Sequence, residues 1–293
     1  MTRQASGTSL VEVLVTMAVT LILATMMFQL FHQNERIIRD QTLIMEMQQT
    51  ARIVAAQITD EIRMAGQGVP VYAAGLDAGQ LEAVAVFLAS TNSTRVDFRA
   101  GLSNVETGAI TGPSDFSLGV PRTLSVLSSA GFLTGKFVYL SYPNTATSWS
   151  WLRGDVVAQT PATLTVIPRN ARVSETTIHF DGPPTIALEE AVSVSFANGS
   201  VRRAMASDMT DPGNPVWSPA NEIGRHFKAL VFSYYDLSGN LVQPTSVANR
   251  MAIARIDVEL TVEVAGPLSD GSRPSYSLAV RSIPRNLRLR TQF

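Results

Sequence analysis

The chain contains no cysteine. This absence excludes disulfide bonds, thiolate catalysis and cysteine-ligated metals, but it does not decide the compartment, because an exported protein can lack disulfides. Charge is also scarce: charged residues make up 16% of the chain, and 23 basic and 24 acidic side chains leave a net charge of -1. A chain so balanced has no overall attraction to nucleic acid or to an anionic membrane, and we expect no nucleic-acid partner.

Signatures of catalysis are missing as well. The sequence has no HExxH, GxSxG, Walker A or paired-glycine dinucleotide motif, and its nearest approach to a phosphate loop, Gly131 to Lys136, has the wrong spacing. The histidines are too scattered to predict a ligand set, and the oxygen-rich stretch Asp236–Asn240 indicates a hairpin turn rather than a calcium loop. The histidines are His32, His179 and His226. We therefore expect that the protein is not an enzyme and that it has no catalytic residue, no cofactor and no metal site.

The main positive feature is one long apolar run near the N-terminus. Leu10 to Leu30 contains 21 residues with a single charge, Glu12, and as a helix it would span about 31 Å, which matches the apolar core of a bilayer. Arg3 is the only basic side chain before the apolar run, whereas a conventional secretory signal has a basic start and a cleavage site after its apolar stretch. A carboxylate inside such a run costs roughly 2.5–3.5 kcal/mol, so Glu12 calls for a partner. An ordinary signal-anchor helix and a cleaved secretory signal are the alternatives.

The residues Gly7-Thr8-Ser9-Leu10-Val11-Glu12 resemble the processing motif of type IV prepilins. The resemblance implies that a prepilin peptidase cuts between Gly7 and Thr8 on the cytoplasmic side and that the new amino group of Thr8 is N-methylated. Thr8 stands where the family usually has phenylalanine or methionine. Cleavage would create an ammonium group that Glu12 of a neighbouring subunit can neutralise, which makes Glu12 the expected assembly residue.

The helix is predicted to continue far beyond the apolar run, because no glycine or proline occurs between Leu30 and Gly66. We expect one helix from about Leu10 to Ala65, ended by the glycines and proline that follow. Its distal half carries an apolar stripe at spacings of three, four or seven, which favours packing on the chain's own sheet over a coiled-coil dimer. The stripe consists of Ile37, Ile44, Met47, Ala51, Val54, Ile58 and Ile62.

From about residue 69 the apolar pattern changes to a period of two, which predicts a mostly antiparallel sheet. Asn198-Gly199 and Asp236–Asn240 are hairpin signals, and Pro212–Pro219 is predicted to be an extended surface loop. The expected strands are Ala83–Leu88, Thr94–Arg99, Phe137–Tyr142, Asp155–Gln159, Thr163–Ile167, Thr176–Phe180, Ala191–Phe196, Val201–Met205, Ala229–Tyr235, Leu241–Gln243, Ala254–Val264 and Tyr276–Ser282.

Two further patterns bear on binding. Trp149 and Trp151 would lie on the same side of a strand, where core packing is favoured over a stacking platform for a sugar or a base. A C-terminal basic run favours a solvated face or a subunit contact over phosphate binding. The run consists of Arg281, Arg285, Arg288 and Arg290.

Together these patterns predict an α+β, pilin-like fold, with one long N-terminal helix packed on a C-terminal, mostly antiparallel β-sheet head. The expected parts are a leader (1–7), a transmembrane or filament-core helix (8–30), its amphipathic continuation (31–66) and the head (67–293). The stretches QITDEIRMAGQG, VSVSFANGSVRR and VFSYYDLSGNLV resemble PilW-type minor pilins.

This resemblance implies a low-copy subunit that starts or tips a type IV pilus. It also implies an inner-membrane single-pass precursor, anchored by Leu10 to Leu30 with its head in the periplasm, that later enters an extracellular filament. Its expected partners are the prepilin peptidase and methyltransferase and the other major and minor pilins. The alternatives are a minor pseudopilin of type II secretion and a pilus-tip adhesin.

Overall fold

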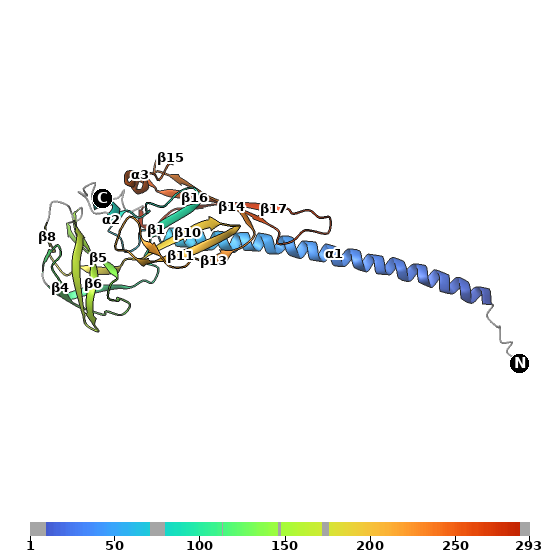
Figure 1. Ribbon diagram of the computed structural model, residues 1–293, viewed down its shortest axis with the longest axis horizontal. Coiled ribbons are helices and arrows are strands. Elements are labelled where there is room, and N and C mark those ends of the chain that lie inside the picture. Colours follow the sequence, from blue (N-terminus) through green and yellow to red (C-terminus); the bar gives the residue numbers. More distant parts are fainter. Residues whose placement is uncertain (1–9, 71–79, 113, 146–147, 172–175, 288–293) are drawn as a thin grey trace.

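The computed structural model describes residues 10–70, 80–112, 114–145, 148–171 and 176–287. One long helix leads into a β-rich body, so the fold is α+β (Figure 1). Helix α1 spans Leu10–Arg63, 54 residues. After it, Gly66 and Gly68 adopt positive φ angles of 84° and 76°, a conformation that glycine enters at little cost. The predicted helix end is thus confirmed to within two residues.

The C-terminal half of α1 packs on the body of the protein. The predicted stripe is buried from Met47 onward, because this part of the helix lies against strands of the sheets beside it. Ile37, by contrast, is 46% exposed, since it lies beyond the reach of those strands. The buried residues of the helix are Met47, Ala51, Val54, Ala55, Ile58, Thr59 and Ile62. Intramolecular packing, rather than a coiled coil, therefore explains the stripe.

Two antiparallel sheets lie beside α1 and share its core. The first has the order β1-β10-β11-β12, with β13 also paired to β11, and the second has the order β15-β14-β16-β17. The first comprises β1 (Arg95–Arg99), β10 (Ala191–Ala197), β11 (Ser200–Asp208), β12 (Val216–Trp217) and β13 (Asn221–Gly224). The second comprises β14 (Phe227–Tyr235), β15 (Leu241–Val242), β16 (Arg255–Glu263) and β17 (Ser275–Ser282), with helix α3 (Val247–Ala252) between β15 and β16.

Sequence predictions for these sheets hold well. Asn198 and Gly199 both have positive φ, 52° and 74°, as the predicted two-residue hairpin between β10 and β11 requires. In β16 the predicted alternation is confirmed, because Val258 and Leu260 are buried while Glu259 between them is exposed. All ladders between named strands are antiparallel.

A closed barrel forms the end of the molecule farthest from the N-terminus of α1 (Figure 1). It has its own core, which includes Phe116, Leu140 and Val166. The barrel order is β2-β4-β7-β6-β5-β9, and a separate two-stranded sheet pairs β3 with β8. These strands are β2 (Glu106–Thr111), β3 (Asp115–Ser117), β4 (Arg122–Val126), β5 (Phe137–Thr145), β6 (Ser148–Thr160), β7 (Thr163–Ala171), β8 (Thr177–His179) and β9 (Thr185–Leu188). The expectation of a single sheet in the head is therefore corrected to three sheets, one of them two-stranded, and a barrel.

Two local predictions were wrong. Ala83–Leu88 was expected to be a strand, but it begins within the short helix α2 (Leu81–Val84) and continues as extended chain with one bridge, Phe87 to Phe98. All of its side chains are buried, so it lacks the alternation that separates strand from helix. Pro212–Pro219 was expected to be a surface loop, yet Gly213 and Pro215 are buried and β12 lies within it.

Candidate functional site

The N-terminal part of α1 is a free-standing apolar helix. Every side chain from residue 10 to residue 39 is exposed, the large apolar ones included. By length and composition this helix can cross a membrane. Apolar surface of this extent is stable only in lipid or against other apolar helices, so this half of α1 is the first candidate for function.

Glu12 lies in the first turn of α1. Its carboxylate is exposed and receives no hydrogen bond from the described residues, while its backbone carbonyl accepts one from the Thr16 hydroxyl at 2.8 Å. The free N–H groups at a helix start favour a carboxylate there. Gly7 and Thr8, the predicted cleavage site and new N-terminus, lie outside the described residues.

Asp40 marks the point at which α1 leaves the body of the protein. Its two carboxylate oxygens accept hydrogen bonds from the Ser269 backbone N–H at 3.0 and 3.1 Å, and a third from the Ser269 hydroxyl. Ser269 lies in the turn between β16 and β17. The hairpin thus holds the helix where its exposed half begins.

A buried ion cluster, which sequence reasoning missed, joins the barrel to the first sheet. Nε of Arg99 on β1 donates to Oε1 of Glu189 at 2.7 Å, and Nε of Arg153 on β6 donates to Oε2 at 2.7 Å. The three side chains are at most 1% exposed. Burying each such ion costs several kcal/mol unless its charge and its hydrogen-bonding groups are all satisfied.

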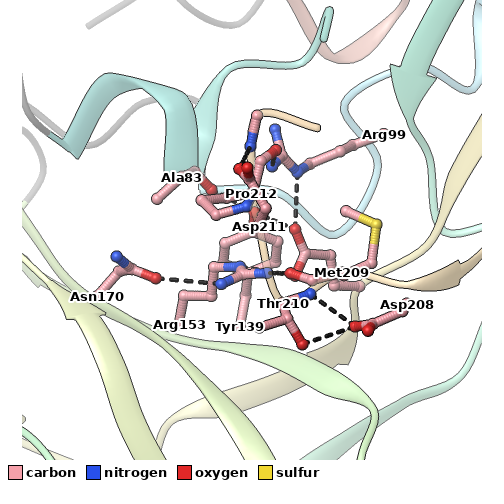
Figure 2. Close-up of polar contacts among 12 residues, drawn as sticks. Ala83, Arg99, Tyr139, Arg153, Asn170, Asp208, Met209, Thr210, Asp211 and Pro212 are labelled. Atoms are coloured by element: carbon pink, nitrogen blue, oxygen red, sulfur yellow. Dashed lines mark hydrogen bonds and ion pairs between the residues drawn. The ribbon is translucent and has the colours of Figure 1, made fainter. Parts of the chain in front are cut away.

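The terminal nitrogen atoms of the two guanidinium groups in this Arg99–Glu189–Arg153 cluster donate hydrogen bonds to oxygen atoms of surrounding segments (Figure 2). Arg99 donates to two carbonyl groups, and Arg153 to one carbonyl and to the Asn170 side chain at 3.1 Å. The carbonyl acceptors are Ala85 and Pro212 for Arg99, and Met209 for Arg153. The cluster therefore ties together α2, β1, β6, β7 and the segment that follows β11.

Tyr139 on β5 completes the cluster. Its hydroxyl lies 3.0 Å from Oε1 of Glu189 and also contacts the Ala83 carbonyl. Burial raises the pKa of the Tyr139 hydroxyl well above its ordinary value, so the group stays protonated and donates. Burial alone lowers the pKa of Arg99, but the oxygens of Tyr139 and Glu189 outweigh it and leave that pKa raised. Because the side chains of the cluster are buried, a substrate in solution cannot reach them. Their role is to join the barrel to the first sheet.

The predicted tryptophan pair and the C-terminal basic run do not form a common site among the described residues. Trp151 is 1% exposed and belongs to the core beside α1, which confirms packing and removes it as a stacking platform; Trp149 is half-buried. In the basic run, the Nε atom of exposed Arg281 donates to Asp257 at 3.2 Å, and Arg285 is exposed. The last two members, Arg288 and Arg290, lie outside the described residues.

The three histidines lie in separate places. His32 faces Glu35 on the exposed part of α1, and His226 occupies a turn with φ of 63°. No group of three histidine or acidic side chains able to hold a metal ion is found among the described residues. The Asp236 carboxylate accepts from the backbone and side chain of Asn240 at 2.8 and 3.0 Å, as the predicted turn requires.

His179 on β8 makes an exposed ion pair with Asp115 on β3, and this pair links the two strands. Its Nδ1 lies 2.8 Å from Asp115, and its Nε2 lies 3.5 Å from Asp181. The hydrogen bond to Asp115 raises the pKa of His179, and the same bond lowers the pKa of Asp115. The pair therefore stabilises the fold only between the two shifted values: it is lost on acidification through the pKa of Asp115 and on alkalinisation through that of His179.

We expect a titration of His179 by two-dimensional NMR to give a pKa above its ordinary value of about 6.5. In the Asp115→Asn variant the pKa should fall toward that value, because the charged acceptor is gone. An unchanged His179 titration in the variant would show that the pair does not form in solution.

Comparisons of the chain with protein-family models, with curated proteins and with solved structures found no match.

Proposed function

We propose that this protein is a minor pilin of the PilW type, a structural and assembly subunit of a type IV pilus. The observation that carries the proposal is a single 54-residue helix whose first part is apolar and exposed on all sides and whose second part is packed on a β-rich head. Such a helix has to be covered by lipid before assembly and by neighbouring helices afterwards. The position of Glu12 in its first turn supports the same proposal.

The continuity of α1 supports a proposed topology for the precursor. Leu10 to Leu30 would span the inner membrane with the N-terminus in the cytoplasm, and the head would lie in the periplasm. Because α1 has no break between this span and the residues packed on the head, extraction of the helix into a filament would carry the head with it. The proposed partners are the prepilin peptidase and methyltransferase, which process the precursor, and the neighbouring pilins, which receive the helix in the filament.

The mass of the N-terminal peptide of the native protein tests the proposal. We expect that peptide to begin at Thr8 and to carry one added methyl group, because the peptidase cuts after Gly7 and then modifies the new amine. In cells that lack the peptidase, the peptide should begin at Met1. A peptide that begins at Met1 in peptidase-containing cells would contradict the proposal.

A further inference from the structure

Strand β17 is a free edge of the second sheet. It pairs with β16 on one side, and no described strand pairs with its other side. The backbone bonds Val264 N to Pro274 O (3.2 Å) and Glu263 N to His226 O (2.8 Å) fix the alternation along the ladder. The even-numbered residues of β17 bond to β16, so the odd-numbered residues direct their N–H and C=O groups outward. These residues are Ser275, Ser277, Ala279 and Arg281.

This edge lacks most of the features that keep strand edges from pairing. Natural edges are shortened, bulged, covered, or protected by proline and charged residues. β17 is eight residues long, its ladder with β16 runs without a register shift, and it contains no proline and one charge, Arg281. Its odd-numbered side chains are exposed and mostly small, so a second backbone can approach closely.

A groove of about 490 Å³ runs between β17 and α1 beside this edge. Its floor is apolar and is formed by small or half-buried side chains from both elements. Thr59 also lines it, and the Thr59 hydroxyl has no hydrogen-bond partner among the described residues. The floor residues are Ala55, Ala56, Leu278 and Val280.

The rim of the groove is basic. Asp60, the one acidic side chain among its described lining residues, already pairs with Arg63 at 3.0 Å. Arg52 on the same rim has no acidic partner among the described residues. At the far end of the edge, Arg281 shares Asp257 with Arg255. The groove and edge therefore favour an acidic partner over a basic one.

We propose that β17 accepts an extended segment of a partner protein as a fifth strand of this sheet. The backbone of the segment bonds to the outward groups of β17, and its alternate side chains point to opposite faces. Those on the side of α1 are apolar and enter the groove, whereas those on the outer side are polar and include an acid near Arg281. An alternating apolar and acidic strand fits all of these features.

The partner is a different protein rather than a second copy. β17 runs in the same direction as α1, because Ser269 contacts Asp40, Ser282 Oγ donates to the Thr59 carbonyl at 3.1 Å, and Arg285 N donates to the Arg63 carbonyl at 3.1 Å. Antiparallel pairing of two β17 strands would point the two apolar half-helices in opposite directions. That geometry is incompatible with the proposed function, on which this inference rests, since both helices must share one membrane orientation. Parallel pairing in register would set Arg281 beside Arg281 of the second copy, and β17 contains no acidic residue to complement it.

The test uses the full-length chain in detergent micelles and a dye-labelled, N-acetylated peptide of twelve residues in which valine alternates with serine and glutamate. Fluorescence anisotropy should show saturable binding. Ala279→Pro removes one outward N–H without removing a bond to β16, and it should weaken binding at least tenfold. Ala279→Val introduces a side chain similar in size to proline but keeps the N–H, and this variant should bind the peptide within twofold of the parent chain.

Ala56→Trp provides a second variant, which fills the groove from an exposed position on α1, and it too should weaken binding at least tenfold. Circular dichroism checks that both variants retain their strand content. Absence of binding to the parent chain, or equal binding to the parent chain and to a folded Ala279→Pro or Ala56→Trp variant, would overturn the proposal. The measurement requires neither processing nor filaments, so its failure would leave the minor-pilin proposal standing.

Discussion

Replacement of Glu189 by alanine is expected to lower the free energy of unfolding by about 3–5 kcal/mol, the range found when one member of a buried ion cluster is removed. The variant leaves Arg99 and Arg153 as two buried guanidinium groups without a counter-ion, since Glu189 is the carboxylate that both Nε atoms contact. Domains of ordinary stability have only about 5–15 kcal/mol in total. The loss is therefore large enough to loosen the attachment of the barrel.

Urea unfolding of the full-length chain in detergent, followed by tryptophan fluorescence, measures this loss. Trp151 is a suitable reporter, because it is buried on β6, two residues from Arg153. The matched control is Glu46→Ala, which removes an exposed carboxylate from α1 and should change stability by less than about 0.5 kcal/mol. Equal stability of the two variants would show that the cluster does not hold the barrel in place.

Replacement of Glu12 by alanine is expected to leave cleavage at Gly7 unaffected and to reduce incorporation into filaments at least tenfold. The proposed reason is that the Thr8 ammonium group of a neighbouring subunit would lose its counter-ion inside an apolar bundle. A charge left unpaired there costs roughly 2.5–3.5 kcal/mol, and each 1.4 kcal/mol corresponds to a factor of about ten in an equilibrium.

The assay compares the amount of the protein in sheared filaments with the amount left in the membrane. Glu35→Ala is the matched control, since it removes an exposed carboxylate from the same helix just beyond the apolar run. It should be incorporated normally. Wild-type incorporation of Glu12→Ala would remove Glu12 from assembly, whereas loss of cleavage would assign it to processing instead.

The helix could be predicted from the sequence because its determinants are local. An uninterrupted run of helix-forming residues, an apolar stripe from Ile37 to Ile62 and the glycines that follow Arg63 all act within a few turns. The same holds for the turn at Asn198-Gly199 and for the alternation in β16. In each case, a short window of sequence contains the whole signal.

The barrel and the ion cluster depend on contacts between distant parts of the chain. The barrel closes through β2, which pairs with β4 and β9, and the sequence patterns predicted none of these three strands. β2 has a mixed burial pattern and β9 only four residues, so neither shows a clear alternation. Arg99 and Glu189 lie 90 residues apart, and nothing local indicates that either charge is buried.

The sequence by itself determined the apolar half of α1, its amphipathic continuation, the position of Glu12 and the hairpins of the second half, because hydrophobic periodicity and turn chemistry are local properties. Only the tertiary structure decided that the head is divided into three sheets and a barrel, that Arg99, Arg153 and Glu189 join the barrel to the first sheet, and that no described strand pairs with the outer edge of β17 beside α1. Strand order and the pairing of buried charges depend on which distant segments meet, and one sequence read along its length does not contain that information.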